Sequence, residues 1–243
     1  MNPKLGLTRT VVRPHYSLIA RDGYVASTLP GWSECKAYVL VSSAMGARLV
    51  QLVIHCDLAG RGKAPAGETE SFLYVIRGAG LLNGERLGEG GFGFVPAGTE
   101  LDFISESEGT HLLLFQKRYE SLQGVSAPAF SVGKEADVPE APFLGDPHAR
   151  LKTLLPDTLG ADMAVNIFTY DAGATLPFVE THVMEHGMLF LSGSGVYRLG
   201  DDWHPVTAED AIWIAPYCAQ WFIAAGPGPA RYIYYKDVNR NPV

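Results

Sequence analysis

The segment from Glu180 to His186 holds the residue types best suited to chemistry. Glu180, His182 and His186 place a carboxylate and two imidazoles at positions i, i+2 and i+6. Residues two apart in a β-strand point to the same face, so Glu180 and His182 can converge, and His186 can join them after a short turn. Two histidines and a carboxylate are a common ligand set for first-row metals and often leave positions open for a substrate. The spacing therefore predicts a metal site.

A fourth ligand is expected on the strand that follows Pro216, where Gln220 stands. The predicted metal ligands are Glu180, His182, His186 and Gln220. This set offers two nitrogens and two oxygens and lacks a thiolate, which argues against a structural zinc site. Mn(II), Fe(II), Ni(II) and Zn(II) are all compatible with it, and the oxygen donors favour Mn or Fe. Glu185 adjoins His186 but is expected to point elsewhere.

Size and charge bound the class of protein that positions these residues. The chain has 243 residues, of which 47% are hydrophobic and 19% charged, enough for one large all-β domain or two small ones with a sizeable core. Its net charge of −7 disfavours nucleic acid or an anionic membrane as the main partner. A small anionic substrate remains compatible, because one lysine in a pocket overrides the global sign.

Cysteine use and the ends of the chain suggest a cytoplasmic protein. The three cysteines, Cys35, Cys56 and Cys218, are odd in number and show no pairing pattern, so no disulfide framework is expected. Residues Met1 to Thr10 have no apolar segment of the kind found in secretory signals. The sequence contains no run of about 18 apolar residues, so no transmembrane helix is expected.

Short strands separated by glycine-rich turns recur along the chain. The predicted strands are Tyr38–Val41, Leu49–Cys56, Phe72–Arg77, Phe92–Pro96, Leu112–Lys117, Met163–Tyr170, Met188–Ser192, Ala211–Ala215 and Tyr232–Lys236. Helical periodicity is scarce. This pattern predicts an all-β sandwich or barrel.

The two halves of the chain resemble each other. Leu73–Gly80 parallels Met188–Gly195, and Glu89–Pro96 parallels Glu209–Pro216, with the glutamate seven residues before the proline in both. An internal duplication explains this spacing better than recurrence of similar hairpins by composition.

The repeat predicts four segments. Residues 1–31 are an N-terminal extension that packs on the barrels, 32–119 form an N-terminal barrel, 120–147 are a proline-rich linker, and 148–243 form a C-terminal barrel. A short helix is expected near His148–Leu155.

The repeat also predicts that only one half holds a metal. In its register, the positions equivalent to the first three ligands are Pro65, Gly67 and Ser71. Glu100, the counterpart of Gln220, is a lone carboxylate there. We therefore expect the N-terminal barrel to be metal-free and structural, and the C-terminal barrel to carry the site.

Several blocks resemble the (S)-ureidoglycine aminohydrolases, a bicupin family in which the cupin barrel is duplicated. The blocks are Pro30–Cys35, Thr69–Gly78, Glu180–Gly187, Gly193–Tyr197 and Tyr232–Arg240. The resemblance runs from about Arg9 to Arg240, and its most specific part is Glu-Thr-His-x-x-Glu-His-Gly. It implies two double-stranded β-helix (jelly-roll) barrels in one chain.

The resemblance also implies an activity. Members of that family hydrolyse (S)-ureidoglycine to (S)-ureidoglycolate and ammonia in purine (allantoin) breakdown, hold Mn(II) in the C-terminal cupin, and form homo-oligomers. By this resemblance, Tyr197, Tyr232 and Lys236 are the catalytic and substrate-binding residues, and Gln220 and Met184 line the substrate pocket. Lys236 suits a substrate carboxylate as a point charge, and the tyrosines can donate hydrogen bonds.

Two other functions are compatible with the residues. One is a cupin dioxygenase with Fe(II), because two histidines and a carboxylate with open positions suit oxygen activation. The other is a metal-bound cupin that binds a small molecule without catalysis. The sequence has no DNA-binding helix-turn-helix or basic patch, which weakens a regulatory role.

Overall fold

The computed structural model describes residues 8–240 and is built almost entirely of β-strands. Its helical elements are the short 3-10 helices η1 (Arg21–Gly23), η2 (Ser43–Met45) and η3 (Glu135–Asp137). Within residues 8–240, no helix is long and apolar enough to cross a membrane. The predicted all-β class is confirmed.

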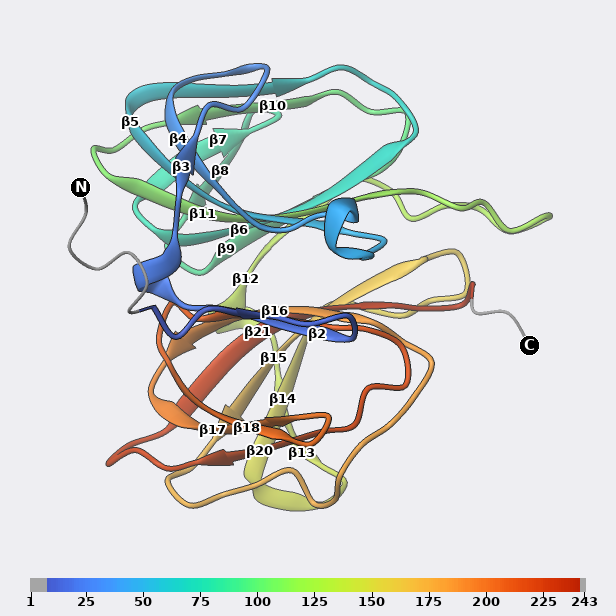
Figure 1. Ribbon diagram of the computed structural model, residues 1–243. Helices are drawn as coiled ribbons and strands as arrows, with labels where there is room; N and C mark the ends of the chain where they lie inside the picture. Colours follow the sequence, from blue (N-terminus) through green and yellow to red (C-terminus); the bar gives the residue numbers. More distant parts are fainter. Residues whose placement is uncertain (1–7, 241–243) are drawn as a thin grey trace.

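One ten-stranded sheet contains strands β3 to β12, drawn from blue to green in Figure 1. We call this sheet the N-terminal or first half of the molecule, and the other two sheets the second half. These strands are β3 (Ala26–Ser27), β4 (Trp32–Val41), β5 (Val50–Ala64), β6 (Thr69–Arg77), β7 (Ala79–Leu82), β8 (Glu85–Gly88), β9 (Gly91–Val95), β10 (Leu101–Ser105), β11 (Thr110–Arg118) and β12 (Ser131–Lys134). Their main order is β12-β9-β6-β11-β5-β10-β7-β8, and β4 joins β5.

An eight-stranded and a three-stranded sheet contain the remaining strands. The larger sheet has the order β1-β2-β19-β16-β21-β15-β14-β13, and the smaller β18-β17-β20. The strands are β1 (Val11–Val12), β2 (Tyr16–Ile19), β13 (Glu140–Phe143), β14 (Asp146–Leu155), β15 (Met163–Tyr170), β16 (His186–Ser192), β17 (Ser194–Leu199), β18 (Asp202–Thr207), β19 (Ala211–Ile214), β20 (Gln220–Ala224) and β21 (Ala230–Asp237).

The strand order repeats between the halves. The order β9-β6-β11-β5 in the first half matches β19-β16-β21-β15 in the second, and β10-β7-β8 matches β20-β17-β18. The glycines that end the paired repeat strands, Gly78 and Gly193, both adopt left-handed φ, 86° and 78°. Ser71 pairs with Gln116 of β11, as His186 pairs with Lys236 of β21. A serine thus occupies the position that corresponds to His186.

All nine predicted strands are confirmed, as β4, β5, β6, β9, β11, β15, β16, β19 and β21; the predicted end residues Leu49, Pro96 and Ala215 each lie one residue outside the observed strand. The helix expected near His148–Leu155 is wrong, because this segment lies in β14. β14 pairs on one side with β13 and on the other with β15. Hydrogen bonding on both edges outweighs a weak local preference for helix.

The segments outside the predicted barrels also form strands. From the extension, β2 pairs with β19 of the second half; residues 1–7 of the extension lie outside the described residues. In the predicted linker, β12 pairs with β9 of the first half and β13 with β14 of the second. The extension and the linker therefore contribute strands to the sheets of the two halves.

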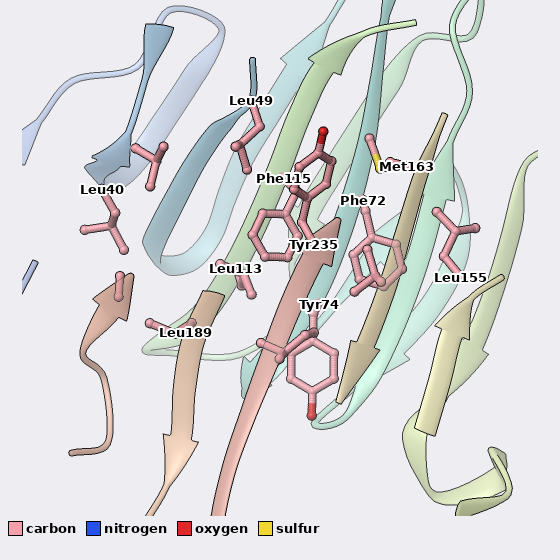
Figure 2. Packing of buried hydrophobic residues seen from close by; sticks show 14 of the residues in the cluster. Leu40, Leu49, Phe72, Tyr74, Leu113, Phe115, Leu155, Met163, Leu189 and Tyr235 are labelled. Atoms are coloured by element: carbon pink, nitrogen blue, oxygen red, sulfur yellow. The ribbon is translucent and has the colours of Figure 1, made fainter. Parts of the chain in front are cut away.

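Three apolar clusters make up most of the core. One lies inside each half, around Leu73 and Leu112 in the first and Phe190 and Tyr232 in the second. The largest lies between the halves, where Phe72 and Phe115 meet residues such as Leu155, Met163 and Tyr235 (Figure 2). Because these strands are buried on both faces, each half depends on the other for part of its apolar burial.

The structure corrects the expectation for the cysteines. Cys35 of β4 stands directly opposite Cys56 of β5, with Cα atoms 4.1 Å apart, and the two form a disulfide. Cys218 is free. The pairing follows from strand register, which the sequence spacing of 21 residues does not reveal.

A buried carboxyl pair also lies between the halves. Glu70 of β6 is 1% exposed and lies beside Asp162, which is fully buried and accepts a salt bridge from Lys117 Nζ at 3.1 Å. Burial, and then the neighbouring Asp162 carboxylate, raise the pKa of Glu70 to about 9, while Lys117 and Arg240 oppose the shift. The folded state therefore favours the protonated form of this carboxyl group.

Replacing Glu70 with Gln is expected to flatten the pH dependence of stability. Because the folded-state pKa is raised above the unfolded value near 4.5, the contribution of this group to stability is fully present below that value and is lost as pH rises towards about 9. The neutral amide removes this loss, so the variant should gain on the order of 2 kcal/mol over the wild type between pH 5 and pH 8.5. Urea denaturation of both proteins at each pH measures their free energies of unfolding. If the variant and the wild type differ by the same amount at both pH values, the prediction is wrong.

Candidate active site

Two neighbouring strands place the predicted residues on one face. His186 at the start of β16 pairs directly with Lys236 near the end of β21. Side chains alternate along a strand, so Tyr232, Tyr234 and Lys236 share a face of β21, and Met188 shares the face of His186 on β16. This shared face points into the second half of the molecule.

An irregular segment carries the candidate ligands Glu180 and His182. Glu180 forms an isolated bridge with Gln220 of β20, through Glu180 N to Gln220 O at 2.8 Å and Gln220 N to Glu180 O at 2.9 Å. The carbonyl of His182, two residues after Glu180, accepts a hydrogen bond from the Tyr217 amide at 2.7 Å. These bonds tie the Glu180–His182 segment to the turn that follows β19 and bring its side chains towards β16.

All the predicted site residues line one cavity of about 160 Å³. The cavity is lined by Phe143, Phe168, Glu180, His182, Met184, His186, Met188, Tyr197, Gln220, Tyr232, Tyr234 and Lys236. Its volume is below the roughly 300–1,000 Å³ of pockets that hold drug-sized ligands. It suits a small metabolite.

The two imidazoles are oriented with their Nε2 atoms towards each other. His182 Nδ1–H donates to Met184 O and His186 Nδ1–H to Tyr235 O, both at 3.1 Å. The Nε2 atoms, 3.2 Å apart, therefore carry the lone pairs. Backbone acceptors on the distal nitrogen are typical of metal-ligating histidines. Facing lone pairs repel unless a cation lies near both, so the arrangement fits a metal ion.

Burial keeps these imidazoles neutral. His186 is 5% exposed, and desolvation, followed by the nearby His182, lowers its pKa to about 3. Desolvation also lowers the pKa of His182. Neutral imidazole is the form that binds metals, so protons compete weakly for these nitrogens near neutral pH.

Gln220 contacts both a histidine and a tyrosine. Its Nε2 lies 3.1 Å from His182 Nε2, and its Oε1 accepts a hydrogen bond from the Tyr197 hydroxyl at 2.7 Å. Turning the amide by half a rotation would direct Oε1 to the histidines and Nε2 to Tyr197. The hydroxyl can accept as well as donate, so either orientation is satisfied. Gln220 is therefore able to act as an oxygen ligand.

Glu180 lines the cavity but stands apart from the histidines. Within residues 8–240, no three His, Cys, Asp or Glu side chains gather closely enough to hold a metal ion. Burial alone raises the pKa of Glu180, and a cation bound beside the carboxyl group would oppose this shift. The two imidazoles, the amide and this carboxyl thus fit a metal by donor type, and the imidazoles also by orientation.

The tyrosines provide protonated hydroxyls. Burial raises the pKa of Tyr197 and of Tyr232 well above the usual value. Tyr197 is bonded to Gln220, while the Tyr232 hydroxyl lies 3.3 Å from that of Tyr170. Both phenols therefore act as hydrogen-bond donors rather than as bases.

Lys236 lies at the rim of the cavity. Its side chain is 22% exposed, and its Nζ forms a salt bridge with Asp157 Oδ2 at 3.1 Å. Asp157 is more exposed, at 60%, and does not line the cavity. The ammonium group is held where it can meet an entering anion.

Four lining residues were missed by sequence reasoning: Tyr234, Met188, Phe143 and Phe168. The alternation of β-strands signals the first two, since Tyr234 lies between Tyr232 and Lys236 at spacing two, and Met188 is two residues after His186. Phe143 comes from the predicted linker, and its place follows only from the β13–β14 pairing.

A larger cavity of about 550 Å³ lies between the halves, away from these residues. Its central carboxylate, Glu135, accepts a hydrogen bond from Tyr74 at 2.6 Å and is paired with Arg231. The Lys152 ammonium donates to Glu135 O at 2.9 Å. These groups satisfy one another, whereas the smaller cavity has facing lone pairs, so we assign the site to the smaller one.

The chain is similar to known proteins over nearly its whole length. No family model matches it. It is 34% identical to a probable (S)-ureidoglycine aminohydrolase of Oryza sativa, over 98% of this chain and 78% of the relative. It is also 34% identical to the (S)-ureidoglycine aminohydrolase of Escherichia coli, over 93% and 90%. The chain belongs to the (S)-ureidoglycine aminohydrolase family.

Solved structures agree with this membership. The structure of protein Ylba from Escherichia coli superimposes with a TM-score of 0.86 at 31% identity, over 100% of this chain and 99% of that one. A Bacillus subtilis oxalate decarboxylase variant superimposes with a TM-score of 0.70 at 11% identity, over 97% and 80%, which shows a shared fold alone. The fold of this (S)-ureidoglycine aminohydrolase family member is therefore of the cupin type.

Replacing His186 with Ala is expected to abolish stabilisation by Mn(II). A metal that binds the folded state adds about 2.7 kcal/mol to the free energy of unfolding at 100 times its dissociation constant. The wild type should show this gain in thermal denaturation and the variant should not. His148→Ala, an exposed histidine of the same half, is the control and should behave as wild type. A full gain in His186→Ala would exclude this imidazole as a ligand.

Proposed function

We propose that this protein hydrolyses (S)-ureidoglycine to (S)-ureidoglycolate and ammonia, a late step of purine (allantoin) breakdown, with Mn(II) as its metal. One observation carries the proposal. The candidate ligands, both tyrosines and Lys236 line a single cavity in a chain whose curated relatives are named for this activity.

The substrate carries an amine, a ureido group and a carboxylate on one carbon. In the reaction, water adds a hydroxyl to this carbon, the C–N bond to the amine breaks, and ammonia leaves with the remaining proton. Stereospecific hydrolysis requires the three substituents to be held in fixed directions. The cavity offers a different group for each: a cation at the rim, hydroxyl donors on the wall and a nitrogen-rich end.

The residues divide these tasks. His182, His186, Gln220 and Glu180 would hold the metal, which when bound supplies Lewis acidity and orients substrate or water. Lys236 would receive the substrate carboxylate as a point charge. Tyr197 and Tyr232 would donate hydrogen bonds to the ureido oxygen, because burial keeps their hydroxyls protonated. The aromatic wall, including Phe168 and Tyr234, would exclude bulk water.

The preference for Mn(II) rests on the donor set. Two imidazole nitrogens and two oxygens, without a thiolate, suit a hard to borderline divalent metal such as manganese. Iron is compatible with the same donors, so oxygen consumption should be measured in the same assay. Ammonia release without oxygen consumption would support hydrolysis over dioxygenation.

We further propose that the two halves are duplicated cupin barrels, of which the second retains the metal site. The repeated strand order and the equivalent pairing of Ser71 with Gln116 and of His186 with Lys236 support a duplication. In this view residues 32–119 and 148–243 form the barrels, each completed by a strand from outside these limits.

The direct test is ammonia release from freshly prepared (S)-ureidoglycine by Mn(II)-loaded protein. The expected result is stereospecific formation of (S)-ureidoglycolate, loss of activity after chelation, and its return with Mn(II). Verified intact substrate that gives no ammonia above the uncatalysed rate would overturn the proposal.

Replacing Lys236 with Met is expected to raise KM by about tenfold to a hundredfold, since a hydrogen bond to a charged group contributes roughly 1.5–3 kcal/mol. Met keeps most of the unbranched side chain and removes the ammonium group with its charge and hydrogen-bond donors. Lys152→Met, in the larger cavity of the same half, should leave KM near the wild-type value. Steady-state kinetics of the three proteins distinguish a carboxylate-binding lysine from a merely structural one.

A further inference from the structure

The face of β16 opposite the cavity packs against the N-terminal half. Glu185 and Gly187 flank His186 and point to this opposite face. A Cβ atom at Gly187 would lie 2.6 Å from Leu49 Cδ1 and 2.8 Å from Gln51 Oε1, so no larger side chain fits there without displacement. The strand that carries His186 therefore rests directly on the ligand-free half.

Glu185 is bonded across this contact. As expected from the sequence, its side chain points away from the cavity. Its Oε1 and Oε2 accept the Arg48 backbone amide at 3.0 and 3.2 Å, and Oε2 also accepts Trp213 Nε1–H at 3.2 Å. Glu185 is 1% exposed. A carboxylate so deeply buried is held in one geometry, because losing any of these donors leaves it unsatisfied.

The same arginine also reaches the neighbouring strand. Asp237, next to Lys236, accepts the Glu185 amide at 2.6 Å through Oδ1 and Arg48 Nη1 at 3.3 Å through Oδ2. Arg48 thus contacts the residues adjacent to both His186 and Lys236. It comes from the turn before β5, in the first half of the chain.

Further contacts continue this support along β16 and β21. Gln51 Nε2 donates to Met188 O at 2.9 Å, and the rings of Phe115 and Tyr235 lie 6.0 Å apart, centroid to centroid. Figure 2 shows Leu49 and Phe115 beside Tyr235 in the space between the halves. Tyr235 in turn provides the carbonyl that orients His186 Nδ1.

We propose that Glu185 is a positioning residue for the metal site, through which the N-terminal half holds His186 in its ligating orientation. With Arg48 and Asp237 it clamps the start of β16 and the end of β21 in register. The inference rests on the proposed function, because it assumes that the imidazoles bind a metal. It assigns a role to the ligand-free half, which supports the site rather than contributing donors to it.

The test is the Mn(II) dissociation constant of Glu185→Gln, measured by calorimetric titration of the full chain. Gln keeps the volume, but if its oxygen takes the place of Oε2 and still accepts from Trp213 Nε1, its NH2 group takes the place of Oε1 and faces the Arg48 backbone amide, donor against donor. Loss of an outer contact of this kind typically weakens metal affinity by about 10- to 100-fold. We expect the dissociation constant to rise by about tenfold.

Glu135→Gln provides the matched control. Glu135 also joins the halves, through Tyr74 on one side and Arg231 on the other, but it is remote from the start of β16. Both variants should lower the denaturation midpoint, and only Glu185→Gln should weaken Mn(II) binding. Equal loss of stability with wild-type Mn(II) affinity in Glu185→Gln would overturn the inference.

A second variant covers the case in which Glu185→Gln does not fold. Gln51→Leu removes the bond to Met188 O, and it costs little otherwise, because Gln51 Oε1 has no hydrogen-bond partner among the described residues. It should weaken Mn(II) affinity a few-fold, and unchanged affinity would count against the inference. If the wild type itself binds no Mn(II), the proposed metal fails; if it binds and the variants match it, only the inference fails.

Discussion

The pairing of β16 with β21 is the constraint on which the rest of the site depends. Because side chains alternate along a strand, this one register sends His186 and Lys236 into the cavity and Glu185 and Asp237 towards the other half. A slip by one residue would exchange the two sets and turn His186 and Lys236 towards the contact with the first half. The register is specified from both sides, by the aromatic interior on one face and by Arg48, Leu49 and Gln51 on the other.

Burial determines the electrostatics of the cavity. It keeps the imidazoles of His182 and His186 neutral and the hydroxyls of Tyr197 and Tyr232 protonated. The cavity therefore offers lone pairs at one end and hydroxyl donors along its wall. Each form suits the role that we propose for it, because a charged imidazole could not bind a metal and an ionised phenol could not donate to a substrate oxygen.

The two halves share one strand order but differ in chemistry. At the position of His186 the first half has Ser71, whose hydroxyl accepts a hydrogen bond from Gln116 Nε2 at 3.0 Å. The first half packs an apolar face against the second half. The largest core cluster lies between the halves rather than within either, so stability and site geometry are linked through the same surface.

The sequence by itself determined the strands, their repetition and the residues that line the cavity as candidate ligands, because the period of two and the spacing of glycines and histidines are local properties. The same alternation, applied along β21, would also have identified Tyr234. Only the tertiary structure decided that residues 148–155 are a strand, that Cys35 meets Cys56, that Phe143 reaches the cavity and that Lys236 is paired with Asp157. It also placed Glu180 in the cavity but apart from the histidines. These features depend on which strands become neighbours and in what register, and that is settled by burial and hydrogen bonding between segments far apart in the chain.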